Sequence, residues 1–299
     1  MMSITPTATL PIPQASLPPA PGGSAPIPVT GTLSPSRATD FMTCPLRYRF
    51  RVIDKLPERP SRPSALGTLV HGVLERLFDL PPEQRTLTQA TAMVEPQWRQ
   101  LIAKEPELAE LFANDPDGGE LANWLTSSTE LLGRYFELED PRRLAPAERE
   151  LYVETVLESG LVLRGYVDRL DIAPSGEIRV VDYKTGRAPS PELAAKALFQ
   201  LKFYALVLWR CYGRAPRRLQ LLYLGSTEVV RYDPDEADLR ATQRKIEAVW
   251  EAISRAKRTG QWQASPSRLC SWCDHQAICP AFGGTPPPLP HEKQSEKLG

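Results

Sequence analysis

The segment Gly176–Gly186 reads Gly-Glu-Ile-Arg-Val-Val-Asp-Tyr-Lys-Thr-Gly, and the interpretation of the rest of the chain starts from it. Its β-branched residues and flanking glycines predict a short strand. Side chains two positions apart on a strand share a face, so Asp182 and Lys184 point in the same direction. An acid and an ammonium are costly near a core unless they pair or bind something. Taken alone, this pattern favours a solvated ion pair at a strand end.

The composition limits the classes of protein that the chain can belong to. Its 299 residues are enough for one large domain or two small ones. Lys plus Arg and Asp plus Glu both number 36, so a nucleic-acid site must come from local clustering of charge. No apolar run approaches the roughly 20 residues of a membrane helix. The first 36 residues are uncharged, which argues against a secretory or transit peptide. We expect a cytoplasmic protein without a membrane partner.

Hydrophobic periodicity predicts the order of helices and strands between two Pro-rich ends. We expect residues 1–30 and 283–299 to be disordered. Helical spacing covers residues 34–45, 66–78, 88–112, 121–138, 192–212 and 236–257, and strand alternation covers 151–158, 161–172, 178–184, 218–224 and 228–232. A three-stranded meander followed by a helix and further strands predicts an α/β fold with a mixed central sheet flanked by helices.

Two features of the first hundred residues each allow two interpretations. His71 and Glu75 are four positions apart and share one helix face, although a lone histidine on a helix is more often structural than a metal ligand. The run Leu46–Arg51 alternates arginines with Tyr48 and Phe50. That alternation suits a phosphate backbone with exposed bases, and it suits a solvated face with core aromatics at least as well.

Two carboxylates on neighbouring strands predict a metal site. Asp168 lies on the second strand of the meander and Asp182 on the third, and a tight turn joins the two strands. Paired carboxylates are ligands for Mg²⁺ or Mn²⁺. Such an ion activates water for attack on a phosphoryl group, and Lys184 would orient that water or offset the developing charge. His71 would complete the site, since imidazole suits Mn²⁺ better than Mg²⁺.

Several motifs, in the same order along the chain, resemble the PD-(D/E)XK nuclease superfamily in its RecB-like branch. They are Gly67-Thr-Leu-Val-His71, Gly165-Tyr-Val-Asp168, Asp182-Tyr-Lys184 and Gln200-Leu-Lys-Phe-Tyr204. The resemblance covers about residues 33–282 and implies a restriction-endonuclease-like fold. It implies metal binding by His71, Asp168, Asp182 and the Tyr183 carbonyl, catalysis by Lys184, and a supporting or DNA-contacting role for Gln200 and Tyr204.

The resemblance also divides the chain into parts. It implies a nuclease domain over residues 31–282, between the two Pro-rich ends. Within this domain we expect a helical part at about 85–140, a catalytic core at about 147–258 and a cysteine cluster at 270–279.

The cysteines form a second pattern. Cys270, Cys273 and Cys279 are closely spaced, and Cys44 lies far upstream. Four such ligands suit an iron–sulfur cluster or a structural Zn²⁺, and His275 could compete as a zinc ligand, so the spacing does not choose. The RecB-like subgroup that includes AddB and the CRISPR adaptation nucleases is similar, with one cysteine before the nuclease core and three after it. That similarity implies a [4Fe-4S] cluster that joins the two ends of the domain.

The resemblance implies a metal-dependent deoxyribonuclease, with DNA single strands or ends as its partner. It further implies an exonuclease of DNA repair or recombination. The sequence contains no G-x-x-x-x-G-K-[ST] motif, so any helicase would be a separate subunit. The alternative is an inactive DNA-binding or accessory subunit stabilised by a four-cysteine metal cluster. That alternative is disfavoured because none of the matched catalytic positions is substituted.

Overall fold

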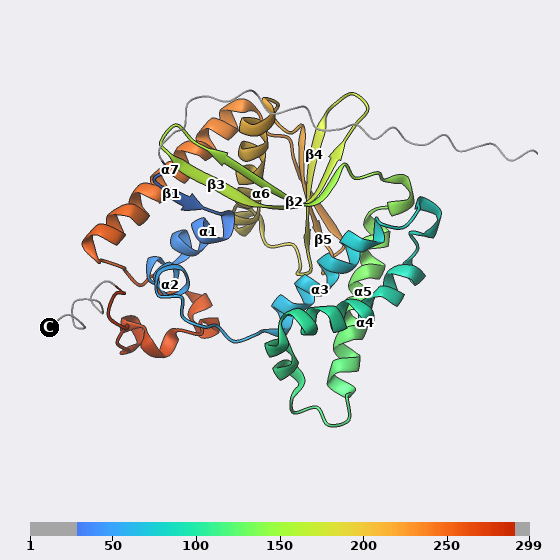
Figure 1. The fold of residues 1–299 in the computed structure, drawn as a ribbon, viewed down its shortest axis with the longest axis horizontal. Coiled ribbons are helices and arrows are strands. Elements are labelled where there is room, and N and C mark those ends of the chain that lie inside the picture. Colours follow the sequence, from blue (N-terminus) through green and yellow to red (C-terminus); the bar gives the residue numbers. More distant parts are fainter. Residues whose placement is uncertain (1–28, 291–299) are drawn as a thin grey trace, which may run out of the picture.

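The computed structural model describes residues 29–290, apart from the side chains of residues 191–196. Its centre is a six-stranded mixed sheet with helices on both faces, as the sequence predicts (Figure 1). The predictions of disorder for residues 1–28 and 291–299 lie outside the described residues. No helix between residues 29 and 290 is both long enough and apolar enough to cross a membrane.

The sheet is built on the predicted meander. Its strands are β1 (Gly31–Leu33), β2 (Glu148–Val156), β3 (Leu161–Ile172), β4 (Ile178–Lys184), β5 (Arg218–Tyr223) and β6 (Glu228–Tyr232). The long strand β3 pairs antiparallel with β2 and β4, whereas β5 pairs parallel with β4 and β6 closes the edge antiparallel. The strand β1 pairs parallel with the start of β3 and was not predicted, because three residues are too few to show alternation.

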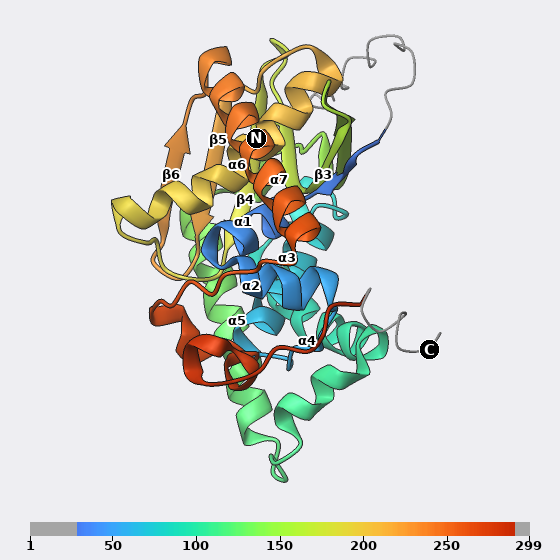
Figure 2. The ribbon, with the colours of Figure 1, turned by 90° about the vertical axis from the view of Figure 1, so that its left-hand side faces the viewer.

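Helices cover the two faces of the sheet in separate layers (Figures 1 and 2). One core joins the sheet to α1 (Pro35–Thr43), α6 (Pro191–Tyr212) and α7 (Glu236–Thr259). The other joins it to α3 (Arg62–Leu77), α4 (Leu87–Lys104) and α5 (Gly119–Leu138). Trp98 and Trp124 are buried in the second core, with ring centroids 4.8 Å apart.

Strand β4 is buried on both faces at its centre, which explains the apolar pair Val180-Val181 there. Val180 belongs to the first core and Val181 to the second, and both are fully buried. A parallel strand covered by helices on both faces is expected to have consecutive apolar residues rather than alternating ones. The polar residues Asp182 and Lys184 therefore lie at the carboxyl end of a parallel strand, where α/β proteins gather their functional groups.

A buried ionic cluster fixes β4 from the side of the second core. The guanidinium of Arg169 is 1% exposed and donates to both carboxylate oxygens of Glu139, at 2.8 and 3.0 Å. It also donates to the Tyr183 hydroxyl at 2.7 Å and lies 3.1 Å from Asp171. Because a buried charge is tolerated only when it is paired, this cluster holds the side chain of Tyr183 in one position.

The aromatic residues of the predicted basic strip are core residues. Tyr48, in the short helix α2 (Pro45–Tyr48), and Phe50 are 1% and 2% exposed. Tyr48 stacks on Trp262, and Phe50 packs edge-on against His275. The interpretation of this strip as a surface for exposed bases is therefore wrong; its rings anchor the returning carboxyl-terminal segment.

The folded part extends past the predicted boundary at residue 282. The amide of Gly284 donates to the Cys279 carbonyl at 2.9 Å. The Arg49 guanidinium donates to the Pro287 carbonyl. Residues 283–290 thus include segments held against the domain.

Candidate active site and cysteine pocket

Residues from α3, β3 and β4 meet at the carboxyl end of β4. His71 reaches over from α3, with Nε2 2.9 Å from the Tyr183 carbonyl oxygen and Nδ1 3.4 Å from Asp168 Oδ2. The Tyr183 amide donates to the same oxygen of Asp168 at 2.9 Å. Histidine, carboxylate and backbone carbonyl, which the sequence assigns to one metal site, therefore lie in direct contact.

Helix α6 supplies the other side of the site. The Lys184 ammonium lies 2.6 Å from Asp182 Oδ2 and donates to Gln200 Oε1 at 3.0 Å. Gln200 Nε2 donates to Asp182 Oδ1 at 3.0 Å and lies 3.4 Å from the Tyr204 hydroxyl. Gln200 thus holds the acid and the ammonium of β4 at once. The structure brings together all the predicted site residues of the nuclease motifs, and their roles in binding and catalysis stay predictions.

Glu150 on β2 is a candidate ligand that the sequence analysis missed. Its carboxylate, a ring nitrogen of His71 and a carboxylate oxygen of Asp168 all lie within 4.8 Å of one another. Its backbone has φ of 44°, which is uncommon for a residue other than glycine. Strained backbone of this kind tends to occur at functional sites. Glu150 therefore joins His71 and Asp168 as a group able to hold a metal ion.

The observed hairpin register explains the position of Glu150. Residues 157 and 161 bond across the tight turn at Ser159-Gly160, and the pairs Arg149–Arg169 and Leu151–Val167 continue the same register. Counting outward from the turn places residue 150 opposite residue 168. A two-residue turn at Ser159-Gly160 between the predicted strands would place residue 151 opposite residue 168. The observed pairing of residue 157 with residue 161 shifts the register by one, so the sequence prediction did not find Glu150.

The site concentrates negative charge in a largely buried place. Burial, reinforced by the Asp182 carboxylate, raises the pKa of Asp168 to about 7. Burial also raises the pKa of Glu150. Burial opposes the charge on Lys184, but the Asp182 carboxylate outweighs it and raises the pKa of the ammonium. Three carboxylates in one largely buried site are the surroundings that a divalent cation stabilises.

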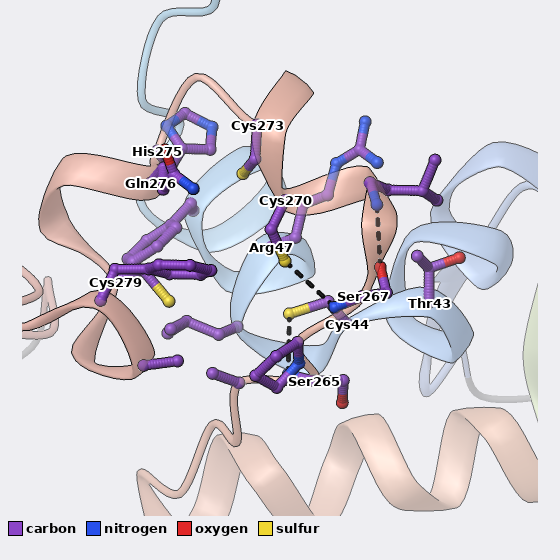
Figure 3. Close-up of a pocket in the computed structure, with 17 residues that line it drawn as sticks. Thr43, Cys44, Arg47, Ser265, Ser267, Cys270, Cys273, His275, Gln276 and Cys279 are labelled. Atoms are coloured by element: carbon purple, nitrogen blue, oxygen red, sulfur yellow. Dashed lines mark hydrogen bonds between the residues drawn. The ribbon is translucent and has the colours of Figure 1, made fainter.

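The four predicted cysteines line one pocket, although they come from opposite ends of the domain (Figure 3). Cys44 lies between α1 and α2, and Cys270, Cys273 and Cys279 lie in the carboxyl-terminal segment. The pocket encloses about 40 Å³ and is otherwise lined largely by apolar side chains. All five cysteines of the chain are free thiols.

Backbone amides point at two of the sulfurs. Ser265 N donates to Cys44 Sγ at 3.4 Å, and Ser267 N donates to Cys270 Sγ at 3.3 Å. Such donors stabilise thiolates in metal sites. His275 lines the same pocket and is 4% exposed, and its Nε2 lies 3.4 Å from a Glu58 carboxylate oxygen.

Comparison with known proteins identifies the family. The family description "PD-(D/E)XK nuclease superfamily" matches residues 32–280, which is most of the chain. The chain belongs to the PD-(D/E)XK nuclease superfamily.

Two phage proteins and one solved structure are similar to this PD-(D/E)XK protein. The Gene 69 protein of Mycobacterium phage D29 is 27% identical over 276 residues, which cover 83% of this chain and 96% of that protein. The Gene 69 protein of Mycobacterium phage L5 is 29% identical over 126 residues, 41% of each chain. The crystal structure of a candidate exonuclease from Eubacterium rectale superposes with a TM-score of 0.55 at 14% identity, covering 88% of this chain and 92% of that one. This last similarity supports the fold.

Membership of the PD-(D/E)XK superfamily makes the protein a nuclease by family, with DNA as the implied substrate and divalent ions as the implied cofactor. The cluster of His71, Glu150 and Asp168 is a candidate site for such an ion.

The raised pKa of Asp168 predicts how the stability of the metal-free protein depends on pH. Between its unfolded value near 4 and about 7, the folded protein keeps a proton on Asp168 that the unfolded chain releases. Stability therefore falls as the pH rises through this window. In EDTA, Asp168→Asn should raise the thermal midpoint more at pH 8 than at pH 5.5.

Thermal unfolding of the wild type and the variant at both pH values checks this expectation. Asp117→Asn, in an exposed turn, is the control and should change the midpoint equally at both. An equal gain for Asp168→Asn at pH 5.5 and pH 8 would contradict the raised pKa.

Proposed function

We propose that this protein is a divalent-metal-dependent exonuclease that hydrolyses phosphodiester bonds in single-stranded DNA or at DNA ends. The observation that carries the proposal is the meeting of His71, Asp168, Asp182 and Lys184 at the end of β4. An isolated surface ion pair would not need a histidine from α3 or a glutamine from α6. The superfamily membership supports the same reading.

His71, Asp168, Asp182 and the Tyr183 carbonyl would hold Mg²⁺ or Mn²⁺, and Glu150 extends this ligand set. Their excess of negative charge, together with the raised pKa of Asp168, fits the binding of a divalent cation. When bound, such an ion polarises a phosphoryl oxygen and lowers the pKa of a coordinated water.

The protein's own residues orient the substrate around this site. Lys184 keeps its charge at neutral pH and is fixed by Asp182 and Gln200, so it can donate to a phosphate oxygen and offset developing negative charge. Tyr204 steadies Gln200 from one turn further along α6. A Cβ on Gly165 would lie 2.6 Å from the Tyr204 ring, so only glycine leaves room for the ring there.

Two similarities support the exonuclease assignment. The motifs resemble the RecB-like branch, and the Eubacterium rectale protein of the same fold is described as a candidate exonuclease. The RecB-like resemblance implies a role in DNA repair or recombination, in which any helicase would be a separate subunit.

We also propose that Cys44, Cys270, Cys273 and Cys279 hold a [4Fe-4S] cluster with a structural role. Among residues 29–290 no three cysteine sulfurs lie within 4.8 Å of one another, so the choice of a cluster over one zinc ion rests on the family resemblance. The apolar lining and the two amide donors suit a cluster.

Removing the ammonium or the acid of β4 should abolish cleavage. Lys184→Ala and Asp182→Ala should each lower the Mn²⁺-dependent cleavage rate of end-labelled single-stranded DNA by at least about 100-fold, with the fold intact. Lys202→Ala is the matched control, because Lys202 lies on α6 beside the site but contacts Asp238. An exonuclease should also degrade linear strands and spare circular ones.

Wild-type cleavage rates in either β4 variant would contradict the assignment. A wild-type protein that binds DNA but cleaves neither linear nor circular strands with Mg²⁺ or Mn²⁺ would support an inactive accessory subunit instead.

The cysteine pocket predicts a coloured protein. Anaerobically purified wild type should contain four iron atoms per chain and absorb near 400 nm, and Cys270→Ser should lose both signals because one ligand is missing. Cys211→Ser is the matched control, since Cys211 lies on α6 outside the pocket. A colourless wild type that contains one zinc ion per chain would contradict the cluster.

A further inference from the structure

Two tyrosines on the β2–β3 hairpin are exposed although both are large aromatic residues. Tyr152 is 45% exposed and Tyr166 is 57% exposed. Their ring centroids are 5.2 Å apart at an interplanar angle of 57°, and in no other pair of contacting rings within residues 29–290 are both rings exposed. Folding does not account for this pair, since neither ring reaches either core.

The tyrosine pair occupies the next position along the hairpin from the acidic site. Tyr152 and Tyr166 are direct cross-strand partners. Tyr152 lies two residues beyond Glu150, and Tyr166 lies two residues before Asp168. Two residues of antiparallel strand span about 6.8 Å, which is about the reach of one nucleotide.

A groove connects the tyrosines with the candidate active site. It encloses about 790 Å³ and is lined by both tyrosines, by Arg164 and Gly165, and by Gln200 and Tyr204 of α6. Gln200 contacts Asp182 and Lys184, so the groove reaches the residues at the end of β4.

The charges along this groove suit a phosphate chain. Arg164 lies on β3 two residues from Tyr166. Its direct cross-strand partner is Glu154, whose carboxylate accepts a hydrogen bond from the Tyr152 hydroxyl. The acidic residue in the wall, Asp40, is paired with Arg51 at 2.5 Å and lies 3.8 Å from Arg47. Its negative charge is therefore compensated, and Arg164 is the cation in the lining that lies beside the tyrosine pair.

We propose that this groove binds single-stranded nucleic acid and guides the strand end into the active site. A base stacks on the Tyr152–Tyr166 pair, and the adjoining phosphate lies beside Arg164. The inference rests on the proposed nuclease function and specifies its substrate as an unpaired strand. Aromatic rings take up single strands because every base has a face to stack, whereas the bases of a duplex are already stacked on one another.

Binding in EDTA tests the groove without any cleavage. The probe is a fluorescein-labelled oligothymidine, compared with a blunt hairpin duplex by fluorescence anisotropy. The double variant Tyr152→Ala/Tyr166→Ala should bind oligothymidine about 5- to 100-fold more weakly, because each stacked base is lost, and should bind the duplex as the wild type does.

Two conservative double variants separate stacking from apolar contact. Tyr152→Phe/Tyr166→Phe keeps both rings and should bind oligothymidine as the wild type does. Tyr152→Leu/Tyr166→Leu keeps apolar area without rings and should behave as the alanine variant. All three should match the wild type in thermal midpoint to within a few degrees, because the side chains are exposed.

Any of several results would overturn the groove proposal. These are no binding of oligothymidine by the wild type, unchanged binding by the alanine variant, and equal binding by the leucine and phenylalanine variants. A wild-type dimer that the alanine substitutions dissociate, with oligothymidine binding unchanged, would assign the tyrosines to a second copy instead. If the alanine variant binds oligothymidine more weakly but the wild type cleaves no DNA, the nuclease proposal is refuted and the groove proposal stands.

Discussion

The structure depends on holding like-charged carboxylates together at the edge of a buried sheet. Asp168 on β3 and Asp182 on β4 face one another by register, and Glu150 approaches Asp168 from β2. Repulsion and burial both oppose this arrangement, as the raised pKa of Asp168 shows. It persists because Lys184, the Tyr183 amide and His71 each supply a partner.

The layers of the fold meet the requirements of this site. Strand β4 is anchored on both faces, through Val180 in one core and Val181 and the Arg169 cluster in the other. Helix α6 must follow β4 to reach the parallel strand β5, and this crossover brings Gln200 beside Lys184. Helix α3, packed in the second core, brings His71 to the opposite side. The ion pair of Asp182 and Lys184 is therefore part of a candidate metal site because of the residues that the fold places around it.

Periodicity and turn chemistry were sufficient to predict the elements that carry the site. The alternation on both sides of Ser159-Gly160 predicted the hairpin, and the helical stripe after β4 predicted α6. These local signals are strong because each element faces a core on at least one side. Glu150 was missed because it lies outside the predicted strand and the observed register differs by one residue from that of a two-residue turn. Strand β1 was missed because it has only three residues and its partner lies about 130 residues away.

Burial of individual aromatics was harder to predict than secondary structure. Tyr48 and Phe50 are buried by Trp262 and His275, which return from more than 200 residues further along the chain. No local pattern carries that information. Tyr152 and Tyr166, by contrast, stay exposed. Their strands pack one face against a core, and these two rings lie on the other face. The structure thus moves the candidate base-stacking surface from the start of the domain to the hairpin beside the carboxylates.

The central claim is that these carboxylates form a metal site for phosphodiester hydrolysis. The most direct measurement is the anomalous difference map of crystals soaked in Mn²⁺, collected above the manganese absorption edge. We predict a peak bounded by His71, Asp168, Asp182 and the Tyr183 carbonyl. A map in which manganese is absent from this position, or occupies only other surfaces of the protein, would contradict the account.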